Sequence, residues 1–136
     1  MIAIVDSGPL VAAADLKDPH HSSCLAVLRR TRTDLVIPAL CMAEATYLVA
    51  RKLGPEGESR FLAGLQPFDV RAPEPDDWPR IAALVRQYRD FALGGTDASV
   101  IALAERMRAE TIITLDRRHF GAIRPGHCER FTLLPG

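Results

Sequence analysis

The sequence predicts an α/β protein with a parallel sheet, because short apolar runs alternate with segments of helical length along the chain. Two of the apolar runs, Ile2–Val5 and Thr111–Leu115, each end directly at an aspartate. The 136 residues are 48% hydrophobic and 25% charged, which is ordinary for a globular protein. A chain of this length can bury a core without disulfides, so we expect one domain over residues 1–136.

The first half of the chain is expected to begin with a strand at Ile2–Val5. A serine followed two residues later by a proline then favours the start of a helix, with Ser7 as the N-cap of a helix over Leu10–Ala14. A second helix is expected over Ser22–Arg30. The remaining elements of this half are a strand at Leu35–Ile37, a long helix from Pro38 to about Lys52 that ends at Gly54-Pro55, a helix at Glu58–Leu65 and a strand at Phe68–Val70.

The second half continues the alternation of helix and strand. A proline-containing turn over residues 73–77 leads into a helix at Trp78–Tyr88, and a glycine-containing loop follows over residues 90–95. An alanine-rich helix over Asp97–Met107 precedes the strand at Thr111–Leu115. The chain then forms a turn over residues 117–120 and a terminal strand at Phe131–Leu134.

Four acidic residues occupy chemically informative places among these elements. Asp6 and Asp116 directly follow two of the expected strands, and Asp97 opens the helix after the glycine-containing loop. Glu44 is the only charged residue in the apolar segment over positions 35–50. If the two strands are neighbours in a parallel sheet, their carboxyl ends meet at one edge, where α/β sheets bind ligands. Converging carboxylates repel one another unless a hard cation such as Mg²⁺ or Mn²⁺ neutralises them.

Each acidic residue also has a structural interpretation. Asp6 could cap the following helix, although Ser7 is the better placed cap, and Asp97 could interact with the dipole of its helix. Asp116 could lie in a solvated turn with the two arginines that follow it. Glu44 is the hardest to explain in this way, because a carboxylate on a largely buried helix is costly unless it is paired or binds a metal. Its structural alternative is a narrow exposed stripe of the helix that it would share with Arg51. The four residues together therefore predict a metal-dependent enzyme that acts on phosphates.

The expected chemistry follows from a divalent ion held by these carboxylates. Such an ion lowers the pKa of a bound water and neutralises charge on a phosphate oxygen. The remaining acidic group could orient or deprotonate the water. Ser7 and Thr96 are each adjacent to an expected ligand, so their hydroxyls are candidate donors to the ligand carboxylates. Both hydroxyls have helix capping as an alternative role.

Charge and cysteine content restrict the class of protein. The 17 basic and 17 acidic residues cancel, and setting aside the four expected ligands leaves a basic excess of four. The three cysteines are far apart, which supports neither a zinc knuckle nor a disulfide framework and fits a reducing cytoplasm. No apolar run approaches the roughly 20 residues that cross a bilayer, so we expect a cytoplasmic protein without a membrane partner.

Several short motifs together resemble those of a PIN-domain ribonuclease. They are Asp6-Ser7 after an apolar first strand, Glu44 in a helix that begins at Pro38, Thr96-Asp97-Ala98 at the start of an alanine-rich helix, and the segment Thr114-Leu115-Asp116-Arg117-Arg118-His119-Phe120. More narrowly, the chain is similar to the VapC toxins of bacterial toxin–antitoxin pairs. The resemblance covers the whole chain, and it depends on the order and spacing of the motifs.

The resemblance implies a five-stranded parallel sheet flanked by helices, with Mg²⁺ or Mn²⁺ held by Asp6, Glu44, Asp97 and Asp116. Asp116 would bind the ion directly or through a water. The implied activity is endonucleolytic cleavage of structured RNA, such as a tRNA or a ribosomal RNA loop, by a metal-activated water that leaves a 5′-phosphate. A homodimer and a cognate VapB-type antitoxin that covers the active-site groove are implied as partners.

Three residues beside Asp116 have alternative roles. Arg117 and Arg118 could contact RNA phosphates or the antitoxin, and each could equally lie in a solvated turn. His119 occupies a recurrent position of the Asp-x-x-His-Phe turn of the family, and we interpret it as structural before catalytic.

Three other functions compete with the ribonuclease. A Mg²⁺-dependent phosphohydrolase that forms an aspartyl-phosphate would need a second carboxylate two residues after Asp6, where the chain has Gly8. A receiver-like binding module would need a lysine near the end of a later strand, but the only lysines are Lys17 and Lys52. A PIN scaffold that binds RNA or protein without cutting it is disfavoured by the intact set of four carboxylates, which are costly to keep together.

Overall fold

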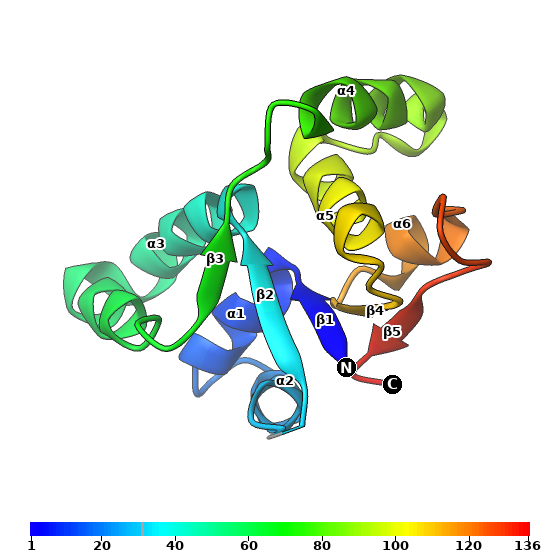
Figure 1. Ribbon diagram of the computed structural model, residues 1–136. Coiled ribbons are helices and arrows are strands. Elements are labelled where there is room, and N and C mark those ends of the chain that lie inside the picture. Colours follow the sequence, from blue (N-terminus) through cyan, green and yellow to red (C-terminus); the bar gives the residue numbers. More distant parts are fainter. Residues whose placement is uncertain (31) are drawn as a thin grey trace.

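The computed structural model describes residues 1–30 and 32–136 and contains a five-stranded sheet in which neighbouring strands are parallel. From one edge to the other the strand order is β3-β2-β1-β4-β5 (Figure 1). The expected α/β architecture, a five-stranded parallel sheet flanked by helices, is therefore confirmed. The strands are β1 (Ile2–Val5), β2 (Asp34–Pro38), β3 (Asp69–Arg71), β4 (Thr111–Ile113) and β5 (Thr132–Leu134).

The most apolar strands form the centre of the sheet. Ala3, Ile4 and Val5 of β1 are fully buried, as are Ile112 and Ile113 of the adjacent β4. Parallel strands that are covered on both faces are nearly continuous apolar runs, a pattern that β1 follows throughout and β4 follows at Ile112 and Ile113. The chain leaves β1 for β2 and β3 on one side and later returns to the other side of β1 as β4 and β5. The strand order therefore switches direction between β1 and β4, which is where α/β sheets place their ligands.

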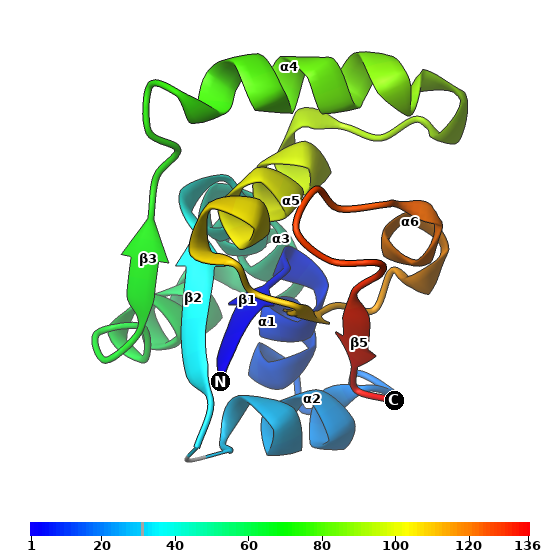
Figure 2. The ribbon, with the colours of Figure 1, turned by 45° about the vertical axis from the view of Figure 1, so that its right-hand side comes forward.

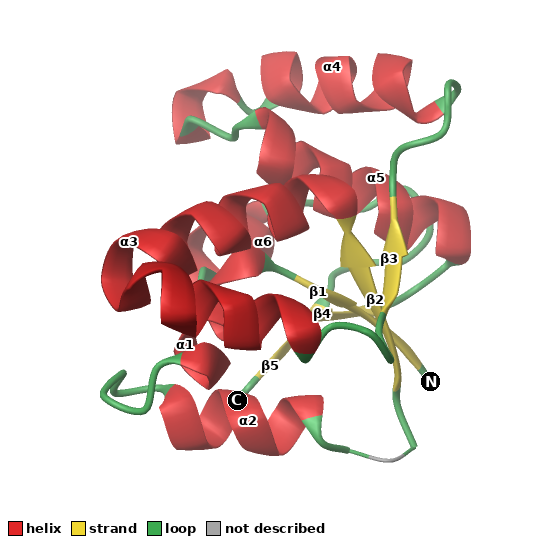
Figure 3. Cartoon of the chain, turned by 90° about the vertical axis from the view of Figure 1, so that its left-hand side faces the viewer, coloured by secondary structure: helices red, strands yellow, loops and turns green. Residues whose placement is uncertain are grey.

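Helices cover the sheet in two groups. On one side α1, α2 and α3 pack together (Figure 3), whereas α5 contacts β1 and β2, and α4 lies over α5 (Figure 2). Within residues 1–30 and 32–136, none of the helices combines the length and the apolar character that a bilayer crossing requires. The helices are α1 (Ser7–Ala14), α2 (His21–Leu28), α3 (Ala39–Ala63), α4 (Asp77–Gln87), α5 (Gly95–Met107) and α6 (Arg117–Ala122), with a 3-10 helix η1 at Arg89–Phe91.

The break expected at Gly54-Pro55 lies inside α3. Gly54 has φ 73° and ψ −175°, a conformation that residues with a side chain rarely adopt, so the helical geometry is interrupted there. Pro55 follows at the start of the second half, where its fixed φ suits a first turn. A hydrogen bond from Thr46 Oγ1 to Glu58 Oε2, at 2.8 Å, connects the two halves. α3 thus contains both helices expected over this region, joined by a kink.

Charged side chains fasten α4 to α5. Arg80 donates to both carboxylate oxygens of Glu105, at 2.8 and 2.9 Å. The buried Asp77 accepts a hydrogen bond from Arg106 Nε at 3.1 Å and a second from the backbone N–H of Glu74 at 2.8 Å. Bidentate pairs of this kind fix orientation as well as distance. They therefore help to hold α5 in place over the sheet, with its N-terminus at the carboxyl edge.

The segment after Asp116 differs from the expected turn. Residues 117–122 form the helix α6, and Asp116 is its N-cap, with a side chain that accepts a hydrogen bond from the backbone N–H of His119 at 2.9 Å. Because α6 has only six residues, it is too short to show the apolar repeat by which longer helices are recognised in a sequence. The strand before it ends at Ile113, two residues earlier than expected.

Candidate active site

The carboxyl ends of β1 and β4 lie beside a cavity of about 550 Å³. The two strands are still joined at this edge, where the backbone N–H of Asp6 donates to the carbonyl oxygen of Ile113 at 2.9 Å. All four predicted carboxylates reach the cavity. The lining residues are Asp6, Ser7, Gly8, Glu44, Asp97, Leu115, Asp116 and His119.

Asp6 is the most buried of the four carboxylates, with 6% of its surface exposed. Its Oδ2 accepts a hydrogen bond from Thr114 Oγ1 and its Oδ1 accepts one from the backbone N–H of Ser7, both at 2.8 Å. Cys41 Sγ also donates to Oδ1, at 3.7 Å. Burial raises the pKa of Asp6 and the charge of Glu44 adds to the rise, although the hydrogen bonds from Thr114 and Ser7 oppose it. Asp6 is therefore held in one orientation and is costly to ionise without a cation.

The expected N-cap at Ser7 is wrong. Asp6 has extended backbone geometry and caps α1 by accepting from the backbone N–H of Ser7, so one carboxylate serves both the helix and the cavity. Ser7 Oγ is consequently available to another partner, and it donates to Glu44 Oε1. Ser7 thus contacts Asp6 through its backbone N–H and Glu44 through its hydroxyl, and its role beside a bound metal stays a prediction.

Glu44 lies on the exposed side of α3, which agrees with the alternative of an exposed stripe, and the helix is less buried than expected. The apolar residues around it suggested burial, but the buried face of this helix is formed by Cys41, Ala45 and Val49. Its carboxylate nevertheless reaches the cavity, where Ser7 holds it. Because Glu44 is exposed, it is accessible to a cation or a water that enters from the solvent.

Asp97 lies in the first turn of α5, with 24% of its side chain exposed. The pKa of Asp97 is raised to about 6, first by burial and then by the negative charges of Asp6, Asp116 and Glu44, and His119 opposes the rise. A shift of this kind is characteristic of carboxylates that crowd one another in the absence of a cation.

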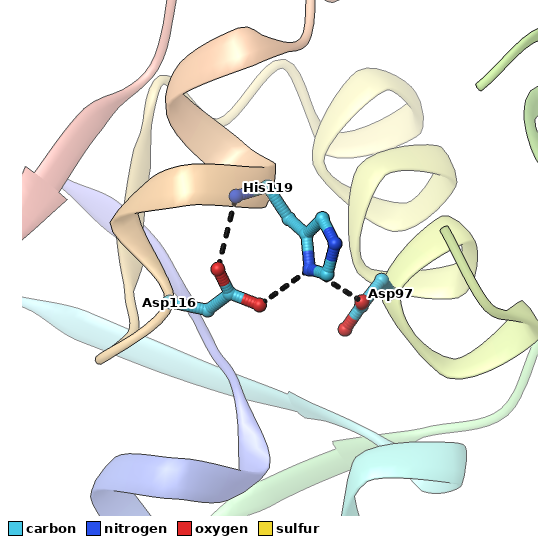
Figure 4. Close-up of side chains that lie close together, drawn as sticks. All are labelled: Asp97, Asp116 and His119. Carbon is cyan, nitrogen blue, oxygen red and sulfur yellow. Dashed lines mark hydrogen bonds and ion pairs between the residues drawn. The ribbon is translucent and has the colours of Figure 1, made fainter. Parts of the chain in front are cut away.

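Asp116 and His119 complete the cluster with Asp97 (Figure 4). His119 Nδ1 is 2.6 Å from Asp116 Oδ2 and 3.7 Å from Asp97 Oδ2. The other ring nitrogen, Nε2, is 2.6 Å from the carbonyl oxygen of Phe91, a group to which it can only donate. The hydrogen bond to Asp116 raises the pKa of His119, and the hydrogen bond to Phe91 adds to the rise. The histidine interpreted as structural from the sequence therefore faces the cavity.

Two buried residues that were not predicted as site residues hold Asp6 in place at the cavity. Thr114 is fully buried, and its Oγ1 accepts a hydrogen bond from the backbone N–H of Asp116 at 2.9 Å while donating to Asp6. Cys41 is also fully buried against Asp6, and burial raises the pKa of its thiol. A hydroxyl two residues before Asp116 is a signal that could have identified Thr114. The contact of Cys41 with Asp6 spans 35 positions, and no local pattern marks it.

Thr96 and the two arginines lie outside the lining of the cavity. Thr96 uses its carbonyl oxygen, which accepts a hydrogen bond from Ser99 Oγ at 2.6 Å, and the structure gives no support to its expected role as a donor to Asp97. Arg117 and Arg118 are exposed in the first turn of α6, and Arg117 Nη1 donates to the carbonyl oxygen of Pro135 at 3.1 Å. Contact of either arginine with RNA stays a prediction.

The donor set of the cavity suits a divalent cation. Carboxylate oxygens are the ligands that Mg²⁺ and Mn²⁺ prefer, and Asp97, Asp116 and His119 offer ligand atoms that all lie within 4.8 Å of one another. Burial, and then the charges of neighbouring carboxylates, raise the pKa of Asp6 and of Asp97, so a bound cation would favour the ionised form of each. A cation at such a site can bind a phosphate oxygen and a water together.

Comparison with known proteins identifies the family. Residues 3–124 match the family model of the PIN domain. The chain belongs to the PIN-domain family. This PIN-domain protein is 34% identical over 134 residues to Ribonuclease VapC26 of Mycobacterium tuberculosis, in a match that covers 97% of the chain and 99% of the relative. The expected resemblance to VapC toxins is thereby confirmed.

Solved structures of a toxin and of a toxin–antitoxin complex share the fold. VapC20 of Mycobacterium tuberculosis, a sarcin–ricin loop cleaving toxin, matches with a TM-score of 0.80 and 13% identity, over 88% of this chain and 94% of that one. A toxin–antitoxin complex from Klebsiella pneumoniae matches with a TM-score of 0.71 and 23% identity, over 89% of this chain and 92% of that one. At these identities the likeness concerns the fold.

Proposed function

We propose that this PIN-domain protein is a divalent-metal-dependent endoribonuclease and acts as a VapC-type toxin. The observation that carries the proposal is the convergence of Asp6, Glu44, Asp97 and Asp116 on one cavity at the carboxyl edge of the sheet. The 34% identity to a protein named Ribonuclease VapC26 supports the same class of reaction.

The four carboxylates would hold Mg²⁺ or Mn²⁺, with Asp116 as a direct or water-mediated ligand. A bound ion would supply an acidified water and would neutralise charge on the scissile phosphate. The protein supplies the arrangement, because Thr114 and Ser7 orient Asp6, and Ser7 also orients Glu44. Glu44 is exposed to solvent and can orient the attacking water or accept its proton. The products would be an RNA fragment with a 5′-phosphate and one with a free 3′-hydroxyl.

The substrate that we propose is structured RNA, such as a tRNA or a ribosomal RNA loop. Arg117 and Arg118 present two exposed guanidinium groups directly after Asp116. Guanidinium groups bind phosphate in a bidentate manner. In the proposal they contact the RNA backbone beside the cleaved bond, so their loss would weaken RNA binding more than it would weaken metal binding.

The proposal includes two protein partners. A cognate VapB-type antitoxin would neutralise the toxin by covering the cavity, and the shared fold of the Klebsiella pneumoniae toxin–antitoxin complex is consistent with such an assembly. A homodimer is the proposed form of the free toxin, and light scattering of the purified chain measures it directly.

The test is cleavage of total cellular RNA by the purified, antitoxin-free chain in Mg²⁺ or Mn²⁺, compared with EDTA. We predict that Asp97→Asn abolishes cleavage while the circular dichroism spectrum is unchanged, because it removes a ligand oxygen but keeps the size of the side chain. Asp76→Asn is the matched control, since Asp76 is an exposed aspartate at the start of α4.

Discrete metal-dependent fragments that are absent with Asp97→Asn would support the proposal, and their ends would identify the cleaved RNA. Full activity in a folded Asp97→Asn variant would refute the site assignment. If the folded, metal-binding chain cleaves no RNA, the proposed activity is wrong, and a non-cutting PIN scaffold or a small-molecule phosphohydrolase replaces it.

A further inference from the structure

We propose that Asp97, Asp116 and His119 form a mixed oxygen and nitrogen site for a divalent first-row transition-metal ion, in which His119 Nδ1 is a direct ligand. The inference deepens the proposed function, on which it rests only in that the cavity binds a cation. It assigns to His119 a role that differs from the structural one expected from the sequence.

The first observation is the separation of the ligand atoms. One oxygen from each aspartate and one ring nitrogen all lie within 4.8 Å of one another. Nδ1 is 2.6 Å from Asp116 Oδ2 and 3.7 Å from Asp97 Oδ2. Ligands that each bind a transition metal at about 2.1 Å are separated from one another by roughly 3 to 4 Å. The three side chains therefore need only small movements to surround an ion.

The second observation is independent of the carboxylates and concerns the opposite side of the ring. His119 Nε2 donates to the carbonyl oxygen of Phe91, which lies in η1 and is 28 positions earlier in the chain. A metal-binding histidine characteristically donates its other ring N–H to a carbonyl or carboxylate, which fixes the tautomer and aims the free nitrogen at the metal. The contact with Phe91 aims Nδ1 at the two aspartates, as Figure 4 shows for the ring and the carboxylates, and an ion that binds Nδ1 displaces to the solvent the proton that Nδ1 and Asp116 Oδ2 share.

The chemistry of the donor atoms decides which cation this site favours. Mg²⁺ prefers oxygen ligands, whereas an imidazole nitrogen favours transition metals in the order of the Irving–Williams series. Asp6 and Glu44 line the same cavity and offer oxygen atoms alone. The cavity therefore has an oxygen-only side suited to Mg²⁺ and, around His119, a side suited to ions such as Mn²⁺ and Co²⁺.

The decisive measurement is pulsed electron paramagnetic resonance of the full chain loaded with Mn²⁺, with and without ¹⁵N-labelled histidine. We expect the coupling of a directly coordinated nitrogen, which changes with the label. His119→Gln should abolish it, whereas His20→Gln should retain it, because His20 is exposed in the loop before α2. In a parallel titration, His119→Gln should weaken Co²⁺ binding by about tenfold or more and should weaken Mg²⁺ binding several times less.

Bound Mn²⁺ without nitrogen coupling in the wild-type chain would overturn the proposal. An equal loss of Co²⁺ and Mg²⁺ affinity in folded His119→Gln would do the same. Should His119→Gln not fold, the wild-type spectra still decide, because His119 is the histidine among the cavity-lining residues. RNA cleavage accompanied by Mn²⁺ binding without nitrogen coupling refutes the His119 site alone. Nitrogen coupling without RNA cleavage in any metal refutes the ribonuclease alone.

Discussion

Thr114 shows how much of the cavity depends on a single hydroxyl. It donates to Asp6 and accepts from the backbone N–H of Asp116, so it links the carboxylate that follows β1 to the backbone that follows β4. We predict that Thr114→Val destabilises the protein by about 1 to 3 kcal/mol, because a buried acceptor and a backbone donor lose their partner. Mn²⁺ affinity should fall by about 10- to 100-fold, because Asp6 is no longer oriented. Urea unfolding and isothermal titration calorimetry measure the two effects.

The matched control is Thr111→Val, because Thr111 is the first residue of β4, the strand that Thr114 directly follows. Thr111 is also buried. Within the described residues, the one hydrogen bond of its hydroxyl is a long contact of 3.9 Å to the sulfur of Met1. This variant should therefore retain metal affinity. If both valine variants lose metal affinity equally, Thr114 has no specific role in orienting Asp6.

The raised pKa of Asp97 makes the metal-free protein sensitive to pH. The pKa is about 6 in the folded chain, compared with an ordinary value of 3.8. Between these values the folded state binds more protons at Asp97 than the unfolded state does, so stability should fall as pH rises through this window. Asp97→Asn should flatten that part of the profile. Urea unfolding in EDTA between pH 4 and about pH 7 measures the free energy of unfolding as a function of pH. If this free energy depends on pH in the same way in the wild-type chain and in Asp97→Asn, the prediction is wrong.

At the scale of the elements, the kink of α3 depends on one glycine. Gly54 has a φ of 73°, whereas Gly64, at the end of the same helix, has an ordinary φ of −72°. We predict that Gly54→Ala costs about 1 to 3 kcal/mol, since a side chain is strained in that conformation. Gly64→Ala should change stability by no more than about 0.5 kcal/mol. If the two substitutions lower the free energy of unfolding equally in urea unfolding, the backbone conformation of position 54 does not require glycine.

The elements also show which features a sequence can reveal. The end of β1 was predictable because its apolar run stops at an aspartate, whereas β4 ends two residues before its aspartate; the pairing of the two strands still places Asp6 and Asp116 at one edge. The helix cap was predicted wrongly, because tertiary packing decides which of the adjacent Asp6 and Ser7 side chains caps α1. The exposure of Glu44 was left between two interpretations, because its apolar neighbours do not reveal which face of α3 is buried. The orientation of His119 was not predictable, because Phe91 belongs to another element and their contact has no local pattern.

At the scale of the whole molecule, metal binding should be visible as added stability. A cation that binds only the folded chain stabilises it by about 2.7 kcal/mol at a concentration 100 times its Kd. We predict that Mn²⁺ raises the Tm of the wild-type chain in a concentration-dependent way and that EDTA reverses the rise. Asp97→Asn should show a smaller shift in differential scanning calorimetry, because a ligand is lost. A Tm that is independent of Mn²⁺ would contradict cation binding at the cavity.

The pairing of β1 with β4 also determines when the cavity can come into existence. Asp6 and Thr114 are in contact although they are 108 positions apart in the chain. Closing so long a loop is entropically costly, and contacts between distant segments form slowly. During translation Asp6 is synthesised long before β4, so its hydrogen bond with Thr114 can form only after β4 has been synthesised. In a nuclease of the proposed kind, the active site would therefore stay incomplete during most of the synthesis of the chain. The RNA of the ribosome that is translating the chain would not be exposed to a working enzyme during that time.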